Sequence, residues 1–202
     1  MIGVINAKSG NIGSLANALK FQNIDFKIVE KKNDIENFKK IILPGVGAFK
    51  KLKQNLIDLE LYDYIKNFIN EEDHSFLGIC VGMQILLSRG TEEGIHDGLN
   101  FFEGEVVNFN KLKKTKTPNI NWLNLNIKKK EKLLNERNKK DFYFLHSYFC
   151  NVINKENIIS TSIYNGIEFP VVIKNKNIYG VQFHPEKSKD QGLQLLKNFS
   201  NL

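Results

Sequence analysis

A glycine-flanked cysteine in the middle of the chain has the spacing of a catalytic nucleophile. The segment 78–82 reads Gly-Ile-Cys-Val-Gly, follows a short apolar run and precedes a predicted helix. This is the pattern of a nucleophile elbow with cysteine in place of serine, in which small flanking residues allow a tight turn. The N-terminus of the following helix would favour the thiolate, the reactive form. We therefore predict that Cys80 is a nucleophile, and we interpret Cys150 as a buried small hydrophobic residue.

A histidine and a carboxylate about a hundred residues downstream could serve that cysteine. The segment 180–188 reads Gly-Val-Gln-Phe-His-Pro-Glu-Lys-Ser, and a predicted strand ends at Phe183. His184 could take the thiol proton and return it to the leaving group, while Glu186 could fix the histidine tautomer. An isolated His-x-Glu is usually a surface pair, but an upstream elbow strengthens the catalytic interpretation. His146 is a competing base that ends another predicted strand without a carboxylate close in sequence.

A glycine-containing loop could supply the second donor of an oxyanion hole. The segment 43–49 reads Leu-Pro-Gly-Val-Gly-Ala-Phe, after a predicted strand and before a helical stretch. A tetrahedral intermediate needs two N–H donors, and the residue after the nucleophile, Val81, would provide one of them. The other would come from Val46 or Gly47, because glycines let backbone N–H groups change orientation. From the loop alone, an ordinary strand-to-helix turn is an equal alternative.

The elements that must position these residues alternate between strands and helices in the first half of the chain. Periodicity predicts strands at Ile2–Asn6, Asp25–Val29, Lys40–Leu43 and Ser75–Ile79. It predicts helices at Ile12–Phe21, Leu56–Asn70 and Met83–Ser88. This rhythm predicts an α/β fold with a mostly parallel sheet covered on both faces. The strand ends would then meet at one edge, where open α/β folds place their sites.

The second half changes to short strands with short connections. The predicted strands are Gly104–Phe109, Trp122–Asn126, Phe142–Leu145, Ile158–Ser162, Pro170–Lys174 and Asn177–Phe183. We expect them to extend the sheet with antiparallel strands. An amphipathic helix at Lys189–Phe199 closes the chain.

Length and composition narrow the class of protein. The 202 residues suit a single domain over residues 1–202. Two cysteines give no disulfide framework and no metal-ligand spacing, so no metal is expected. The net charge of +7 comes from scattered residues without a nucleic-acid-binding signature, which predicts no nucleic-acid partner. No apolar run reaches the roughly 18 residues of a membrane span, and no signal peptide is recognisable, so we expect a cytoplasmic protein with no membrane partner.

Taken together, the motifs resemble the class I, or triad, glutamine amidotransferases. The matching pieces span nearly the whole chain: GNIGSLANAL (10–19), LPGVGAF (43–49), FLGICVGMQILL (76–87), TEEG (91–94), GL (98–99), FYFLHSY (142–148), GVQFHPEKS (180–188) and GLQLLKNF (192–199). The resemblance implies a flavodoxin-like fold and hydrolysis of L-glutamine to glutamate and ammonia through a glutamyl thioester on Cys80, with no cofactor. It also implies that Gln84 and Glu92 hold the glutamine and that Ser147 and Tyr148 contact it.

The segments PGVGAF, HSY and HPEKS resemble one branch of this family in particular. That resemblance implies a heterodimer with a HisF-like (β/α)8 synthase subunit, which receives the ammonia and forms imidazole glycerol phosphate and AICAR in histidine biosynthesis. Asn11, Trp122, Tyr143 and Lys187 match family positions at that interface.

One segment departs from this branch. The family usually reads Pro-His-Met-Gly-Trp-Asn, whereas residues 118–123 read Pro-Asn-Ile-Asn-Trp-Leu. Asn121 stands in place of a glycine, and asparagine tolerates a positive φ best among other residues, so we expect the turn to be kept. An alternative function is therefore ammonia supply to a HisF-like partner in surface-sugar (acetamidino sugar) biosynthesis. Two further alternatives are a cysteine hydrolase or peptidase on a similar scaffold and a regulatory binding module that retains the fold.

Overall fold

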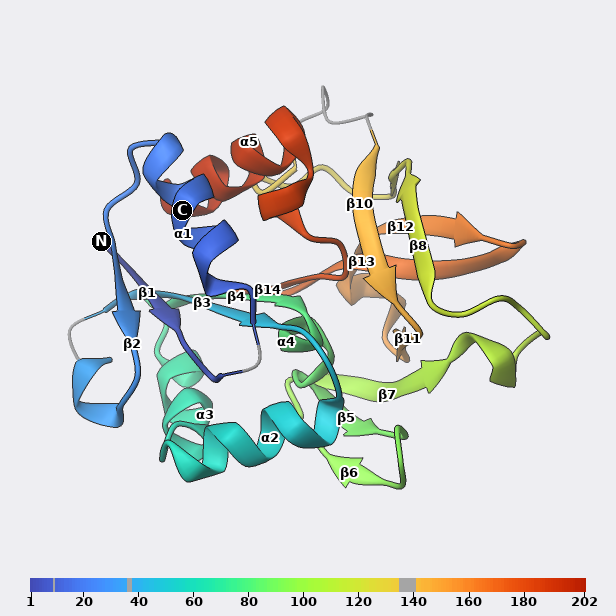
Figure 1. Ribbon diagram of the computed structural model, residues 1–202, viewed down its shortest axis with the longest axis horizontal. Coiled ribbons are helices and arrows are strands. Elements are labelled where there is room, and N and C mark those ends of the chain that lie inside the picture. Colours follow the sequence, from blue (N-terminus) through green and yellow to red (C-terminus); the bar gives the residue numbers. More distant parts are fainter. Residues whose placement is uncertain (9, 36–37, 135–140) are drawn as a thin grey trace.

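The largest sheet in the computed structural model, which describes residues 1–8, 10–35, 38–134 and 141–202, has eight strands. They lie in the order β2-β1-β3-β4-β14-β13-β12-β9 (Figure 1). The first five are mutually parallel and the last three are antiparallel. The strands are β1 (Ile2–Ile5), β2 (Phe26–Val29), β3 (Lys40–Gly45), β4 (Ser75–Cys80), β9 (Asn126–Ile127), β12 (Ile158–Tyr164), β13 (Ile167–Asn175) and β14 (Ile178–Val181).

Helices cover both faces of the parallel part of this sheet (Figure 1). On one face lie α1 (Ile12–Phe21) and α5 (Lys189–Ser200), and on the other α2 (Phe49–Asp58) and α3 (Tyr62–Asn70). The predicted mostly parallel sheet with helices on both faces is therefore confirmed. In the part of the chain that the structure describes, no helix is long and apolar enough to cross a membrane.

The predicted helix Leu56–Asn70 is wrong, because the structure has two helices there. The backbone leaves the helix at Glu60, which has a φ of +57°. The N–H of Leu61 then bonds to the carbonyl of Leu56, and the N–H of Glu60 to that of Ile57. This pair of bonds is the Schellman arrangement that ends helices, with Glu60 at the position usually taken by glycine.

The predicted helix Met83–Ser88 is also wrong. Helix α4 spans only Val81–Gln84, and strand β5 (Leu87–Gly90) follows. The carbonyls of Ile85 and Leu86 accept hydrogen bonds from the segment 99–102 instead of continuing a helix. A single helical turn sums few peptide dipoles, so the helix contributes little to any stabilisation of a thiolate at Cys80.

The predicted antiparallel additions are confirmed, because β13, β12 and β9 extend the large sheet. The second half also adds two small sheets beside it, which were not expected. One has the order β11-β7-β5-β6 and the other pairs β10 with β8. Their further strands are β6 (His96–Asp97), β7 (Phe102–Asn108), β8 (Asn119–Leu123), β10 (Phe142–His146) and β11 (Tyr148–Val152). Strand β11 was not predicted. Asn121 lies in extended β8 without a positive φ, so the expected turn at that residue is wrong.

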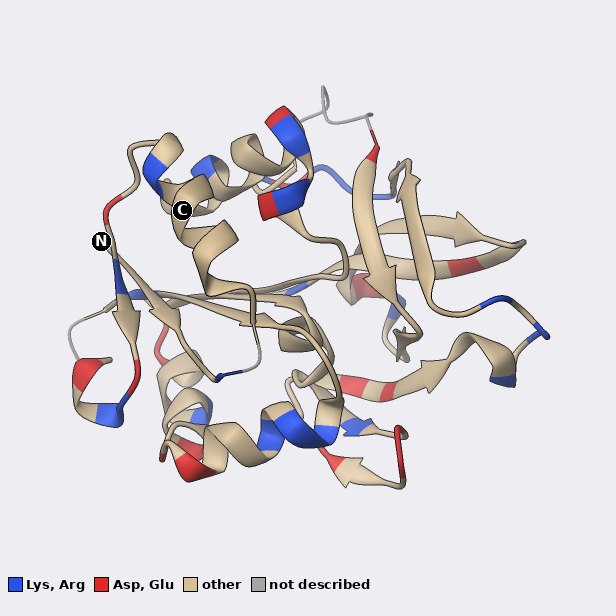
Figure 2. Ribbon diagram, in the orientation of Figure 1, with Lys and Arg blue, Asp and Glu red and all other residues tan. Residues whose placement is uncertain are grey.

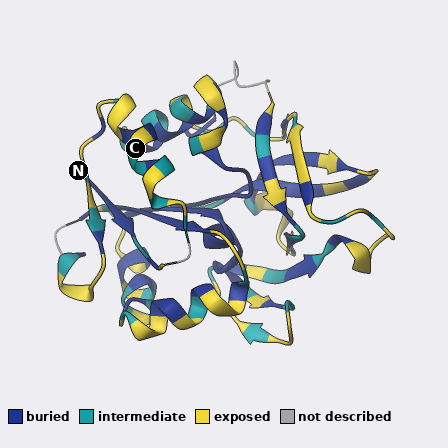
Figure 3. Ribbon diagram, viewed as in Figure 1, coloured by how far each residue is buried: buried dark blue, intermediate teal, exposed yellow. Residues whose placement is uncertain are grey.

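Most apolar side chains of the described residues are buried and most charged ones are exposed, but strand β8 carries large apolar side chains at the surface. The strands of the large sheet are mostly buried, whereas β8 is exposed along most of its length (Figure 3). Lysines and arginines are spread over the helices and loops and are interspersed with acidic residues (Figure 2). The exposed strand β8 carries the large apolar side chains of Ile120 and Trp122, which are 54% and 41% exposed.

Candidate active site

Strand register brings the predicted catalytic segments to one edge of the sheet. Strands β3, β4 and β14 are parallel neighbours, with Gly45 opposite Cys80 and Val181 opposite Ile79. The oxyanion segment after β3, the cysteine at the end of β4 and His184, three residues past β14, therefore leave the sheet side by side. This placement follows the rule that open α/β sheets bind ligands beyond the carboxyl ends of their strands.

The turn at Cys80 is strained and tightly packed. Cys80 has φ +55° and ψ −109°, a conformation that non-glycine residues rarely adopt. A Cβ on Gly78 would lie 2.2 Å from the carbonyl oxygen of Gly82, and a Cβ on Gly82 would lie 1.9 Å from that of Leu43. Both flanking residues must therefore lack a side chain. Strain of this kind, about 1–3 kcal/mol, is typical of functional positions.

The imidazole of His184 is held by the carboxylate of Glu186. The His184 Nδ1 and Glu186 Oε1 atoms are 2.9 Å apart, and both side chains are buried. The 3₁₀ turn Pro185–Lys187 makes this close approach possible. The backbone N–H of His184 donates to the carbonyl of Tyr143 at 2.9 Å, which ties the turn to β10. The carboxylate therefore leaves Nε2 as the nitrogen available for proton transfer.

The environment of His184 favours its protonated form. Burial alone lowers the pKa of His184, but the Cys80 sulfur and the Glu186 carboxylate raise it more, and the result is a pKa of about 10. Within the described part of the chain, Nε2 of His184 has no hydrogen-bond partner. The nearby Cys80 sulfur nevertheless contributes to the raised pKa of His184. A negative sulfur beside a positive imidazole is the charge distribution that cysteine hydrolases use.

The cysteine and the histidine share one cavity with the other predicted site residues. Its volume is about 370 Å³. It is lined by Val46, Gly47, Ala48, Cys80, Val81, Gln84, Glu92, Pro118, Leu145, His146, Ser147, Tyr148 and His184. The structure thus brings together the nucleophile, the histidine, the oxyanion candidates and the four predicted substrate-binding residues, while Glu186 lies buried behind His184.

The oxyanion candidates come from two elements that line the cavity with Cys80. Val81 opens α4, and the first N–H groups of a helix have no partner within it. Gly47 has a φ of +93°, and Val46 beside it is 39% exposed. A positive φ at this loop shows that its peptides already depart from the extended conformation of β3. The arrangement can present N–H groups from two elements to one oxygen.

Two of the predicted substrate-binding side chains already bond to protein groups. The Nε2 of Gln84 donates to the carbonyl of Tyr148 at 2.9 Å. The Oε2 of Glu92 accepts the N–H of Phe49 at 2.9 Å, at the start of α2. Glu92 therefore ties the start of α2, directly after the proposed oxyanion loop, to the segment that follows β5. The sequence alone did not indicate this contact.

His146, the competing base, is held neutral. It is buried, and its Nδ1 lies 2.8 Å from the carbonyl of Tyr148, while its Nε2 lies 3.1 Å from Nδ2 of Asn119. Burial lowers its pKa to about 4, with the positive charge of His184 acting in the same direction. Because both ring nitrogens are occupied and no carboxylate supports them, His146 is not placed to act as the general base.

The predicted partner-facing residues fall into one cluster and one separate position. The rings of Trp122 and Tyr143 meet edge to face at 5.6 Å, and the ammonium of Lys187 lies 5.7 Å from the centre of the Tyr143 ring. Tyr143 in turn lies 6.4 Å from the His184 ring. Asn11 caps α1 by accepting the N–H of Ser14 at 3.2 Å. The cluster gives a contiguous series of ring contacts from the exposed β8 to His184.

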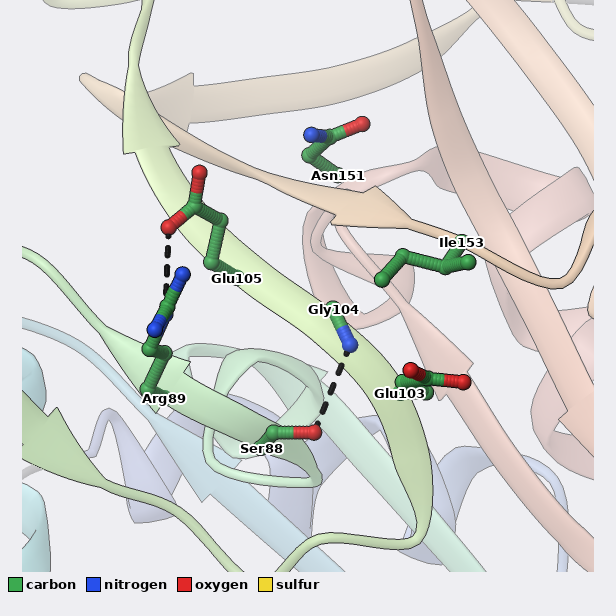
Figure 4. Close-up of a pocket in the computed structure, with 7 residues that line it drawn as sticks. All are labelled: Ser88, Arg89, Glu103, Gly104, Glu105, Asn151 and Ile153. Carbon is green, nitrogen blue, oxygen red and sulfur yellow. Dashed lines mark hydrogen bonds and ion pairs between the residues drawn. The ribbon is translucent and has the colours of Figure 1, made fainter.

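A second cavity of about 300 Å³ lies away from these residues (Figure 4). It is formed by β5, β7 and the end of β11, and Arg89 pairs with Glu105 at its edge at 3.2 Å. No member of the predicted site lines it. Among the described residues, no group of three or more histidine, cysteine, aspartate or glutamate side chains could hold a metal ion.

The chain is similar to known proteins along its full length. The family Glutamine amidotransferase class-I matches residues 3–201. Imidazole glycerol phosphate synthase subunit HisH 1 of Campylobacter jejuni subsp. jejuni is 40% identical, with both chains covered completely. The HisH subunit of Caldanaerobacter subterraneus subsp. tengcongensis is 42% identical over all of this chain and 98% of its own.

Solved structures show the same fold at lower identity. A crystal structure of a glutamine amidotransferase has a TM-score of 0.74 and 18% identity, covering 100% of this chain and 99% of its own. The PurLQS structure from Thermotoga maritima has a TM-score of 0.76 and 16% identity, covering 99% and 97%. From the full-length family match and the relatives near 40% identity, we conclude that the chain belongs to the class-I glutamine amidotransferase family, among the proteins named HisH.

Proposed function

We propose that this protein hydrolyses L-glutamine to glutamate and ammonia, with Cys80, His184 and Glu186 as its catalytic triad. The observation that carries the proposal is the shared cavity. Cys80 and His184 both line it, and Glu186 holds the ring of His184 from behind at 2.9 Å. The family match over residues 3–201 supports the same chemistry and a single glutaminase domain over residues 1–202.

In the proposed reaction, the Cys80 thiolate attacks the side-chain amide carbon of glutamine. The electron pair of the C=O bond moves to oxygen, where the N–H of Val81 and that of Val46 or Gly47 stabilise it. As the C–N bond breaks, the imidazolium of His184 gives its proton to the nitrogen, which leaves as ammonia. A glutamyl thioester remains on the sulfur.

Water then hydrolyses the thioester. The neutral imidazole of His184 accepts a proton from the water as its oxygen attacks the thioester carbon. The C–S bond breaks, the sulfur leaves as a thiolate, and glutamate forms with loss of its new carboxyl proton to solvent. The enzyme returns to its starting ionic state. Gln84, Glu92, Ser147 and Tyr148 would hold the glutamine through this cycle, because they line the same cavity.

We propose that the ammonia passes to a HisF-like (β/α)8 synthase subunit that forms imidazole glycerol phosphate and AICAR in histidine biosynthesis. The relatives named as imidazole glycerol phosphate synthase subunits support this pathway. The face formed by Ile120, Trp122, Tyr143 and Lys187 supports the docking position. Asn11, at the N-terminus of α1, is a separate proposed contact. A cytoplasmic location belongs to the same proposal.

One observation favours a second pathway. Residues 121 and 123 of β8 are asparagine and leucine, where the family usually has glycine and asparagine, and the buried Asn119 stands in place of a histidine. A changed partner face would suit a HisF-like partner in acetamidino-sugar biosynthesis, with the same triad. Purified protein assayed with the barrel protein of the same genome and each candidate acceptor would distinguish the two pathways by the product formed.

The nucleophile assignment is tested by removing the sulfur. We expect Cys80→Ser and Cys80→Ala to lose ammonia release from glutamine by roughly a thousandfold or more, because the covalent route is closed. Thermal unfolding should change little, since the side chain is small. Cys150→Ala is the matched control and should retain glutaminase activity. Turnover near the wild-type rate in either Cys80 variant would refute the triad, and cleavage of peptides instead of glutamine would support a peptidase.

A further inference from the structure

A line of buried amide side chains ends on the nucleophile. Gln182 is completely buried, and its Nε2 lies 3.6 Å from the Cys80 sulfur. Gln84, 3% exposed, donates from its own Nε2 to the Oε1 of Gln182 at 3.2 Å and to the carbonyl of Tyr148 at 2.9 Å. These contacts join the residue that follows β14 to α4 and β11 beside the sulfur.

The orientation of these amides follows from one acceptor. A backbone carbonyl can only accept hydrogen bonds, so the Tyr148 carbonyl requires the NH₂ end of Gln84. The second hydrogen of that NH₂ group points to Gln182 and requires the oxygen of Gln182 there. The NH₂ end of Gln182 is then left to face the sulfur. The hydrogen bonds therefore determine which end of each amide is oxygen and which is nitrogen.

The anchoring carbonyl is itself held from its other side. Nδ1 of the neutral His146 donates to the Tyr148 carbonyl at 2.8 Å, so its Nε2 is an acceptor and receives the Nδ2 hydrogen of Asn119 at 3.1 Å. Asn119 is fully buried although it belongs to the exposed strand β8, and its Oδ1 accepts from Asn121 at 2.8 Å. This series of hydrogen bonds begins at Asn119, beneath the proposed docking face. It reaches the active site through the Tyr148 carbonyl, which accepts from both His146 and Gln84.

We propose that Gln182 is a further catalytic residue, whose side-chain N–H donates to the Cys80 sulfur and stabilises it as the thiolate. This inference rests on the proposed function and adds to the triad a donor that the mechanism above does not use. The hydrogen bond strengthens when the sulfur is negative, because charge-assisted bonds are stronger than neutral ones. It therefore acts twice, before attack on glutamine and again when the thioester breaks and the sulfur leaves. Gln84 and Asn119 are positioning residues that hold the donor toward the sulfur.

Other groups around the sulfur also influence its charge. The imidazolium of His184 favours the thiolate, whereas the carboxylates of Glu186 and Glu92 oppose it. His146 is neutral, and burial together with the nearby Cys80 sulfur raises the pKa of the Cys150 thiol. Gln182 differs from the charged groups because it acts through the direction of its amide, and its Nε2 contacts the sulfur directly.

The test measures the pH dependence of Cys80 alkylation by iodoacetamide in the full-length chain. The alkylated Cys80 peptide is quantified by mass spectrometry, so reaction at Cys150 does not interfere. Gln182→Met keeps the length of the side chain without a donor, and Gln182→Glu places an acceptor at the sulfur. Gln194→Met, at an exposed position on α5, is the matched control. Thermal unfolding monitors the fold of each variant.

We expect both Gln182 variants to shift the alkylation midpoint upward by about one pH unit or more, roughly a tenfold loss of thiolate at neutral pH. The value of kcat should fall by a similar factor while KM changes little. Asn119→Ala should produce a smaller shift of the same sign, and adding it to Gln182→Met should cause no further shift, because both act through one line of bonds. The Gln194→Met control should match the wild type.

The proposal is overturned if folded Gln182→Glu alkylates Cys80 with the wild-type pH profile, or if the shifts of Asn119→Ala and Gln182→Met simply add. If Gln182→Met does not fold, the isosteric Gln182→Glu and the Asn119→Ala variant still decide the matter. Failure here is distinguishable from failure of the proposed function, because glutamine turnover that survives Cys80→Ser would refute the triad whatever the Gln182 variants do.

Discussion

At the scale of single residues, the proposed mechanism depends on a sulfur and an imidazole whose charges support each other. Cys80 is held with a positive φ at the end of a strand, and His184 is buried against Glu186. Burial would normally favour a neutral histidine, and here the Cys80 sulfur and the Glu186 carboxylate outweigh that effect and raise the pKa of His184. In the same cavity, the pKa of His146 is lowered, because its ring is buried without a carboxylate beside it. The two histidines therefore have different roles in spite of being close together.

The raised pKa of His184 predicts the alkaline side of the pH profile. Activity needs the imidazolium to protonate the leaving nitrogen, so it persists below the pKa of His184 and falls as pH rises through it. We expect the alkaline limb of kcat/KM to lie well above the ordinary histidine value of about 6.5. Glu186→Gln removes one of the two groups that raise this pKa and should move the limb to lower pH, by about one unit. A limb that stays in place in Glu186→Gln would contradict the assignment of Glu186.

At the scale of elements, close backbone approaches and helix ends decide where side chains go. The two glycines of the elbow leave no room for a Cβ, which lets β4 turn directly into α4. The break between α2 and α3 is made by Glu60 in the left-handed region rather than by glycine or proline. A helix that continued past residue 58 would carry α3 away from the sheet face that it covers.

The Schellman motif at Glu60 predicts a stabilising substitution. A non-glycine residue in the left-handed conformation costs about 1 kcal/mol or more, which glycine avoids, although glycine loses more entropy on folding. We expect Glu60→Gly to raise the free energy of unfolding by roughly 0.5–1 kcal/mol, measured by urea denaturation. Asp58→Gly, within α2 and at a helical φ, is the control and should be destabilising. A loss of stability in Glu60→Gly would show that its side chain contributes more than its backbone costs.

Local patterns predicted the elements that depend on neighbours in sequence. The helix Ile12–Phe21 and the elbow at 78–82 could be predicted because apolar spacing and glycine placement are local signals. The shortness of α4 could not, since it depends on which distant N–H groups take the carbonyls of Ile85 and Leu86. The contact of Gln182 with the sulfur was missed for a similar reason: it depends on the register of two parallel strands. One sequence signal could have suggested this contact. Gln182 lies two residues before His184, so both side chains would point to the same side of an extended segment.

At the scale of the whole molecule, the exposed β8 face and the active site are adjacent. Trp122 lies on this face, with the ammonium of Lys189 at 5.0 Å from its ring and Tyr143 beside it. Val46, in the proposed oxyanion loop, lines the active-site cavity together with Pro118, which precedes β8, and Leu145 of β10. A partner that covers this face would therefore touch both the loop and the line of residues that leads to His184.

This adjacency predicts that the isolated chain has weak glutaminase activity and that the barrel partner increases it. Trp122→Ala should weaken partner binding by roughly ten- to a hundredfold, as expected for a partly exposed tryptophan at the centre of an interface. Titration calorimetry with the HisF-like protein of the same genome measures the affinity. Ile163→Ala, at a similarly exposed apolar residue on β12, should bind normally. Equal losses in both variants, or full activity without the partner, would contradict the proposed docking face.

The most direct test of the central claim is covalent labelling with a glutamine analogue that carries a diazoketone in place of its amide. Such a reagent alkylates a nucleophile only after binding where glutamine binds. We predict a single adduct on Cys80, slowed by added glutamine, strongly slowed in His184→Ala and absent in Cys80→Ala. An adduct on Cys150 or another residue, or a Cys80 adduct whose formation glutamine does not slow, would contradict the account.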